Sequence, residues 1–268
     1  MCDLELKADS VMRIGIVLVL AIYLSLLSVA QSITVSGSSQ SQVVRVPFVG
    51  CQSDGQVGPL KAPRGKSKAV SITAAAAQRL AYYQAEEGLG VLAPRGWYCF
   101  GTYGSAGSTL YVAPQPVNAA DLFSDQWSGF SGSAIEFASM IGDTSGRFTV
   151  ARTIARVFPF HKAFVKNVIE EGIEPASSFP FGAYSKDKLV YRSKEIVEFQ
   201  TPAETDGLGT DSYLLKNSSP ICGVAILYGE ELDLLFLSAR LPAELVDLAP
   251  IIIRQVERDA AHFAKQEK

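Results

Sequence analysis

The stretch from Val91 to Pro114, VLAPRGWYCFGTYGSAGSTLYVAP, constrains the fold more than any other part of the chain. Within Ala93-Pro94-Arg95-Gly96, the proline presets φ for the second position of a turn and the glycine suits its fourth, so we expect a chain reversal before Trp97. A second turn, rich in glycine, spans residues 103–108, and Thr109 to Val112 returns as a strand. This pattern predicts a β-hairpin at the centre of a sheet.

A second hairpin is predicted near the C-terminus. Ile221 to Tyr228 and Asp233 to Ala239 are nearly continuous apolar runs separated by a turn at Gly229-Glu230. Such runs are typical of strands that are covered on both faces. The segment from Pro250 to Phe263 follows as a long helix, because proline is well tolerated in the first turn. The expected buried stripe of this helix is Ile252, Val256, Ala260 and Phe263.

Two other segments carry clear local patterns. The alanine-rich segment from Thr73 to Glu87 predicts a helix, because threonine is a favourable N-cap and Gly88 a natural end. The segment from Ser133 to Met140 alternates as a strand, which places Glu136 on one face and its apolar neighbours on the other. A first strand is expected from Val43 to Val49.

These elements predict an α+β fold, with antiparallel hairpins near 97–113 and 221–239 packed with several helices, the longest at the C-terminus. The order of turn, tryptophan, glycine turn and strand, together with the Pro-x-Gly-Trp stretch at Pro94–Trp97 and the late hairpin before a long helix, is similar to the antiparallel sandwich of the PsbP and Mog1 type. The resemblance implies the arrangement of the fold, and no functional residue is carried over from it.

The N-terminus predicts export. Ile14 to Ala30 is an uncharged, mostly apolar run that ends in Ser28-Val29-Ala30, so small residues occupy the positions that a signal peptidase reads before Gln31. We therefore expect residues 1–30 to be a signal peptide. Acidic residues precede the apolar core where positive charge is usual, so Met12 is an alternative start. An uncleaved membrane anchor over residues 14–30 is the alternative interpretation.

Composition and charge limit the remaining possibilities. Residues 31–42 are rich in serine and glutamine and are expected to be a linker, whereas residues 43–268 are expected to form one α+β domain. The chain is 48% hydrophobic and 19% charged, which suits a globular core. Its formal net charge of −3 argues against nucleic-acid binding. The expected location is secreted or periplasmic, with membrane anchoring only if residues 14–30 are retained.

Export changes how the cysteines are interpreted, because an oxidising compartment favours disulfides. Removal of the signal would leave three cysteines, so one would stay unpaired. Cys51 lies in a glycine-containing turn and Cys99 in the central hairpin, whereas Cys222 lies in an apolar run typical of a buried strand. We expect a Cys51–Cys99 disulfide, with Cys222 as a buried thiol.

A basic run extends from Gly146 to Asn167, a segment without any acid. Arg152 and Arg156 are one helical turn apart and therefore share a flank. This run predicts contact with an acidic partner, anionic lipid or an acidic wall polymer. The alternative is a solvated helix flank whose charges are paired with acids elsewhere. The candidate binding residues are Trp97, Tyr103, Arg152, Arg156, Lys162 and Lys166.

Catalytic patterns are weaker. Cys99 and His161 are candidates for a thiol nucleophile and its base, and a pair of carboxylates for an acid–base site. The carboxylates considered are Asp54, Asp121, Asp125, Glu136 and Asp143. The two histidines are far apart in sequence, and no CxxC, HExxH or phosphate-binding glycine pattern occurs, so neither a metal nor a cofactor is expected.

The sequence therefore favours a non-catalytic binding or interaction module of the cell envelope. The alternative is a secreted hydrolase that uses Cys99 and His161, or an unassigned pair of carboxylates. A disulfide at Cys99 would exclude the cysteine hydrolase, because the thiolate is the nucleophile.

Overall fold

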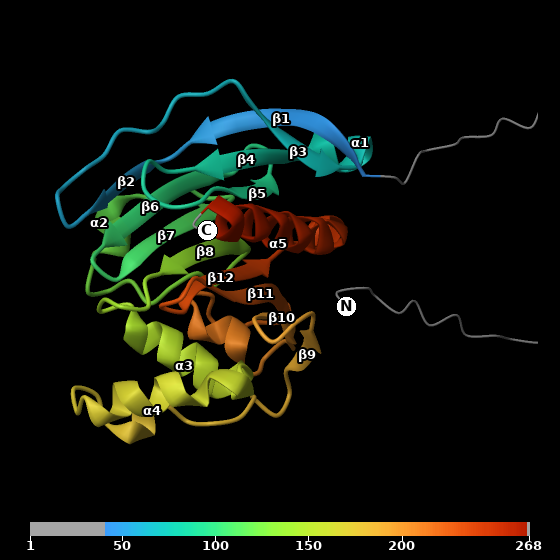
Figure 1. Cartoon of the computed structure of the whole chain (residues 1–268). Coiled ribbons are helices and arrows are strands. Elements are labelled where there is room, and N and C mark those ends of the chain that lie inside the picture. Colours follow the sequence, from blue (N-terminus) through green and yellow to red (C-terminus); the bar gives the residue numbers. More distant parts are fainter. Residues whose placement is uncertain (1–40, 267–268) are drawn as a thin grey trace, which may run out of the picture.

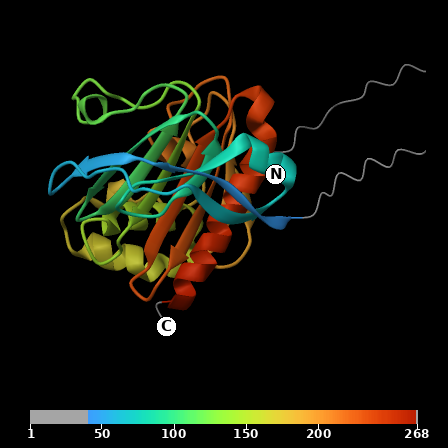
Figure 2. The ribbon, with the colours of Figure 1, turned by 90° about the horizontal axis from the view of Figure 1, so that it is seen from above.

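The computed structural model of the protein describes residues 41–266. Its strands form a four-stranded and an eight-stranded sheet, with helices on both faces of the larger sheet (Figures 1 and 2). The fold is therefore α+β, as the two predicted hairpins indicate.

The smaller sheet has the strand order β3-β1-β4-β5. β1 pairs with β3 in antiparallel and with β4 in parallel orientation. Its strands are β1 (Gln42–Gly50), β3 (Ser67–Ile72), β4 (Leu80–Gln84) and β5 (Val91–Pro94).

The larger sheet has the order β2-β6-β7-β8-β12-β11-β10-β9 and is antiparallel except for the edge pair of β2 and β6. Both predicted hairpins belong to it, as β6–β7 and β11–β12. Its strands are β2 (Gln52–Gly55), β6 (Tyr98–Gly104), β7 (Gly107–Ala113), β8 (Ala134–Met140), β9 (Lys188–Tyr191), β10 (Ile196–Thr201), β11 (Ile221–Tyr228) and β12 (Asp233–Arg240).

The helices cover the larger sheet unequally. α5 lies between the two sheets on one face, and α3 and α4 lie on the other (Figure 1). The α-helices are α1 (Ala74–Arg79), α2 (Ala119–Leu122), α3 (Arg147–Val157), α4 (Lys162–Glu170) and α5 (Ala249–Gln266). Short 3₁₀ helices are η1 (Pro159–His161), η2 (Ala176–Ser178), η3 (Leu208–Asp211) and η4 (Ala243–Leu248).

The alternation of side chains along β8 divides the core in two. Ile135 and Phe137 pack into the core that contains α5, whereas Ala138 packs into the core that contains α3. Successive side chains of a strand point to opposite faces, so Glu136 lies on the α3 face, away from Ile135 and Phe137. The predicted separation of Glu136 from its apolar neighbours is thus confirmed.

The tight turn between β6 and β7 depends on glycine. Gly107 has φ of +134°, and a Cβ there would lie 2.0 Å from the carbonyl oxygen of Ser139 on β8. A side chain at this position would therefore push β7 away from β8 as well as strain the backbone. The second turn predicted in the central stretch is confirmed.

The helix predicted from Thr73 to Glu87 is largely wrong. Thr73 does cap α1, accepting a hydrogen bond from the N–H of Ala76 at 3.2 Å, but the helix ends at Arg79. Leu80–Gln84 is instead strand β4, paired between β1 and β5. Tyr82 and Tyr83 are buried there, and β-pairing on both sides outweighs the local helix preference of the preceding alanines.

The C-terminal helix agrees well with its prediction. α5 begins at Ala249, with Pro250 in its first turn, and Ile252, Val256 and Ala260 are buried. The side chain of Phe263 lies outside the described part of the chain. The nearly continuous apolar strands β11 and β12 are buried on both faces, as predicted.

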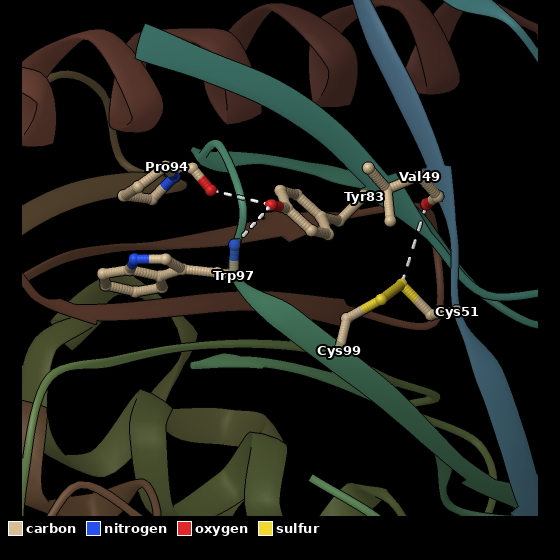
Figure 3. The surroundings of a disulfide bond; sticks show 6 residues. All are labelled: Val49, Cys51, Tyr83, Pro94, Trp97 and Cys99. Atoms are coloured by element: carbon tan, nitrogen blue, oxygen red, sulfur yellow. Dashed lines mark hydrogen bonds between the residues drawn. A yellow bond between two sulfur atoms is a disulfide. The ribbon is translucent and has the colours of Figure 1, made fainter. Parts of the chain in front are cut away.

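The predicted disulfide between Cys51 and Cys99 is present, with a Cα–Cα distance of 5.4 Å (Figure 3). It joins the junction of β1 and β2 to β6, where the two sheets meet. Beside it, the hydroxyl of Tyr83 donates to the carbonyl of Pro94 at 2.7 Å and accepts from the N–H of Trp97 at 3.2 Å. A disulfide of this kind indicates an oxidising, extracytoplasmic location.

Two other predictions need comment. Cys222 is buried in β11 as expected, but no cysteine of the described chain is free, so the expectation of a left-over thiol is wrong. The predicted signal peptide, linker start and alternative anchor fall within residues 1–40, outside the described residues. Among residues 41–266, no helix combines the length and apolar character needed to cross a membrane.

Candidate functional site

A cavity of about 670 Å³ lies between the larger sheet and α3. Side chains of β6, β7, β8 and β12 form its floor, α3 forms one wall, and the segments around η2 and η3 close the remainder. Its volume is within the range of small-molecule sites, which is typically about 300–1,000 Å³.

The floor carries hydroxyl groups and one acid. Thr102 and Thr109 are paired across β6 and β7, and Tyr111 is paired with Glu136 across β7 and β8. All four side chains line the cavity. The antiparallel register thus brings polar groups from three strands onto one face of the sheet.

Glu136 is the most unusual residue of the floor, because only 5% of it is exposed. Its Oε2 accepts a hydrogen bond from the backbone N–H of Tyr213 at 2.7 Å. Burial raises the pKa of Glu136 from 4.5 to about 7, and the Tyr213 hydrogen bond opposes this effect only in part. Near neutral pH this carboxyl is therefore divided between its protonated and ionised forms.

A second polar group lies beside Glu136. Ser238 of β12 is directly opposite Glu136 in the register of the two strands. Its hydroxyl is fully buried and has no hydrogen-bond partner among the described residues. Buried polar groups are normally paired, so this part of the sheet has unused hydrogen-bonding capacity.

The helical wall is basic. Arg152 and Arg156 are one turn apart on α3, and both line the cavity. Arg152 Nη1 is 2.8 Å from Glu174 Oε2, while the guanidinium of Arg156 lies over the ring of Tyr184, 4.0 Å from its centroid. The predicted shared flank of these two arginines is confirmed.

Tyr184 and Asp211 close the side of the cavity next to Arg156. The Tyr184 hydroxyl donates to Asp211 Oδ1 at 2.6 Å. Burial, helped by Asp211, raises the pKa of Tyr184 to about 12. Burial also raises the pKa of Asp211, whereas its hydrogen bond with Tyr184 and the charges of Arg156 and Arg152 lower it. The arginines therefore act on Asp211, at the helical side of the cavity.

An aromatic cluster borders the floor on the other side. The ring of Tyr213 lies 6.1 Å from that of Tyr111 and 4.7 Å from that of Trp127, and Phe130 completes the group. Tyr213 is 48% exposed, so the cluster is open to solvent at this residue. Its contacts hold the Tyr213 backbone where it binds Glu136.

The predicted binding residues separate into two groups. Tyr103, Arg152 and Arg156 line the cavity. Trp97 instead packs against the core near Tyr83, and Lys162 and Lys166 are exposed on α4 outside the cavity lining. The structure thus brings together three of the six.

The basic run is less isolated than its sequence suggests. Arg147 Nη2 lies 2.7 Å from Glu171 Oε2, and Arg152 is paired with Glu174, so acids further along the chain neutralise part of the charge. Paired arginines still present N–H groups to a ligand, because a guanidinium has five donors.

The cysteine-hydrolase alternative is excluded. Cys99 is bonded to Cys51 and has no thiolate, and the nearest acid to His161 is Glu195, at 3.9 Å. Among the acids considered from the sequence, only Glu136 lines the cavity. The signal that could have distinguished it was its position within an otherwise apolar strand. Within residues 41–266 no cluster of side chains suited to a metal ion is present.

Comparisons of the chain with protein-family models, curated proteins and solved structures found no match. The similarity to the PsbP and Mog1 sandwich is therefore not confirmed. The function has to be inferred from the chemistry of the cavity.

Proposed function

We propose that the protein is an exported, non-catalytic binding module that holds a small organic ligand with a carboxylate or phosphate group in the cavity between the larger sheet and α3. One observation carries the proposal: Arg152 and Arg156 line a cavity of about 670 Å³ that is large enough for a small molecule. An anionic group recognised by two guanidinium forks gains both charge and geometric complementarity.

The contacts of the arginines support this interpretation. Arg156 donates from Nη1 to the carbonyl of Gly182 at 3.2 Å and rests on Tyr184, so its guanidinium is held in place with donors remaining. Arg152 is held by Glu174 and by a hydrogen bond from Nη2 to Thr149 Oγ1 at 3.3 Å. Side chains held in this way lose less freedom when a ligand binds.

A small ligand is favoured over a membrane or an acidic polymer. A flat or extended anionic surface would be met by the exposed lysines of α4, Lys162 and Lys166, which lie outside the cavity lining. The arginines instead share the cavity with the hydroxyls of Thr109 and Tyr111 and with the ring of Phe236. This combination of apolar surface with a few polar groups is typical of small-molecule sites.

The test is a titration of small carboxylates and phosphates by calorimetry, with two matched variants. Arg156→Ala should weaken binding at least about tenfold, because it removes a charge-assisted contact. Lys166→Ala removes an equal charge from the same basic run and should leave affinity unchanged. Equal weakening by both variants would place the site on α4, and failure of every anion to bind would overturn the proposal.

A second candidate function is supported by one specific observation. Glu136 and Asp211 line the same cavity, and both have a raised pKa because of burial. A carboxyl with a pKa of about 7 suits a general acid, and a second carboxylate would complete a glycoside hydrolase site. Turnover of chromogenic glycosides that is abolished by Glu136→Gln would favour this function over binding alone.

A further inference from the structure

The charges of the cavity are separated by layer. The arginines belong to the helical wall and lower the pKa of Asp211, whereas the opposing influence on Glu136 is the amide of Tyr213. Among the described residues, no cation is hydrogen-bonded or ion-paired with Glu136. The floor therefore holds an acid whose charge the protein leaves uncompensated.

An ionised carboxylate in a buried site is costly unless a donor or cation meets it. Glu136 has one backbone donor, the N–H of Tyr213, and no side-chain donor among the described residues. The rings of Tyr111 and Tyr213 lie 6.1 Å apart, both residues line the cavity with Glu136, and aromatic faces attract cations. The floor thus has the features of a site for a positively charged group.

We propose that the ligand is zwitterionic, with an ammonium group bound by Glu136 and a carboxylate bound by Arg152 and Arg156, and that it is a short peptide with free termini. This inference rests on the proposed function and specifies the ligand of the same cavity. It extends that function because it assigns a role to the acid on the floor.

The distance between the layers favours a peptide over a single amino acid. The charges of Arg152 and Arg156 act on Asp211 and not on Glu136, so the two charged sides of the cavity lie apart, whereas the two charged groups of an α-amino acid are attached to one carbon atom. An extended chain advances about 3.3–3.6 Å per residue, so the terminal charges of a peptide of roughly three residues are about 10 Å apart. The hydroxyls of Thr102 and Thr109 on the floor and of Thr149 on the wall also line the cavity, where peptide groups need hydrogen-bond partners.

The experiment is a calorimetric titration of the full mature protein at pH 7.5 with alanine peptides of about one to five residues. Each peptide is compared with its N-acetylated and its C-amidated form. We expect affinity to be highest near three residues and to fall at least about tenfold when either terminus is blocked, as for the loss of a charge-assisted contact.

Two variants assign each terminus to its side of the cavity. Glu136→Gln keeps the acceptor for the Tyr213 amide but removes the charge, so it should bind free and N-acetylated peptides equally well. Arg156→Ala, which retains Arg152, should weaken the preference for a free carboxylate but keep the preference for a free amine in full. Circular dichroism confirms that each variant is folded, and the comparison of blocked with free peptides on the parent protein requires no variant.

The outcomes separate this inference from the proposed function. If N-acetylated peptides or simple carboxylates bind as tightly as free peptides, the zwitterionic ligand is overturned while the anion site remains. If free peptides bind but Glu136→Gln keeps its preference for them, the ammonium is bound elsewhere and the inference is also wrong. If neither peptides nor other anions bind, both proposals fail.

Discussion

The backbone N–H of Tyr213 donates to Oε2 of Glu136 over 2.7 Å, linking the segment after η3 to the centre of the larger sheet. This bond is the only direct contact described between a backbone donor and the buried acid, and it does not offset the effect of burial on the pKa.

Stability should decrease between about pH 4.5 and pH 7. The pKa of Glu136 rises from 4.5 to about 7 on folding, so in this range the folded state binds more protons than the unfolded state. The free energy of unfolding therefore falls as pH rises, by up to about 3 kcal/mol, and levels off above pH 7.

Glu136→Gln isolates this effect from the other acids whose pKa is raised. The variant should be more stable than the parent at pH 8 and lose that advantage at pH 4, because glutamine cannot ionise. Urea unfolding of the parent and the variant between pH 4 and pH 8 checks this difference in stability. Parallel stability curves for the two proteins would show that Glu136 does not titrate as described.

Arg240 should be essential for the loops next to the cavity. It is only 1% exposed, and its guanidinium donates to the carbonyls of Phe130, Gly132 and Leu215. Arg240→Met keeps much of the side-chain volume but leaves the carbonyls of Gly132 and Leu215 without their donor, whereas the carbonyl of Phe130 still accepts from the N–H of Leu215. We expect a loss on the order of 3–5 kcal/mol in the free energy of unfolding.

Arg95→Met is the control for Arg240→Met. Arg95 also donates to two carbonyls, of Leu80 at 3.0 Å and Ala77 at 2.6 Å, but it is exposed. Water can replace its hydrogen bonds, so the loss should be no more than about 1 kcal/mol. A similar effect of both substitutions would mean that burial does not set the cost at Arg240.

The Cys51–Cys99 disulfide should contribute substantially to stability. It closes a loop with a sequence separation of 48 residues, which corresponds to about 4 kcal/mol in the chain-entropy model. Replacement of both cysteines by alanine should lower the free energy of unfolding by this order. Peptide mapping without reduction should recover the Cys51 and Cys99 peptides joined to each other.

The mature protein should begin near Gln31. The apolar core of the N-terminal segment ends in small residues at the positions that a signal peptidase reads. N-terminal sequencing of the exported protein checks this prediction. Recovery of a cytoplasmic protein that retains Met12 would contradict it.

The sequence predicted those elements whose signals are local. Pro94 and Gly96 mark one turn of the central stretch, and Gly107 marks another, so the hairpin could be placed without knowledge of its neighbours. The strand after Arg79 could not be predicted in this way, because its conformation depends on pairing with β1, more than 30 residues earlier. Local helix preference has little weight against two strand partners.

The cavity could be predicted only in part from the sequence, for a similar reason. Periodicity placed Arg152 and Arg156 on one flank and Glu136 opposite its apolar neighbours, and both assignments are confirmed. That these faces meet depends on α3 crossing the sheet, and the pairing of Arg152 with Glu174 depends on the return of the chain after α4. No local pattern contains this information.

The pairing of β8 with β12 also determines when the larger sheet can form during folding. Phe137 pairs with Leu237, about 100 residues later, and this pair lies in the middle of the larger sheet. Contacts between such distant segments form late because a long loop must close first. Until β12 has been synthesised, the first four strands of the sheet, β2, β6, β7 and β8, lack the partner strand that joins them to the other four.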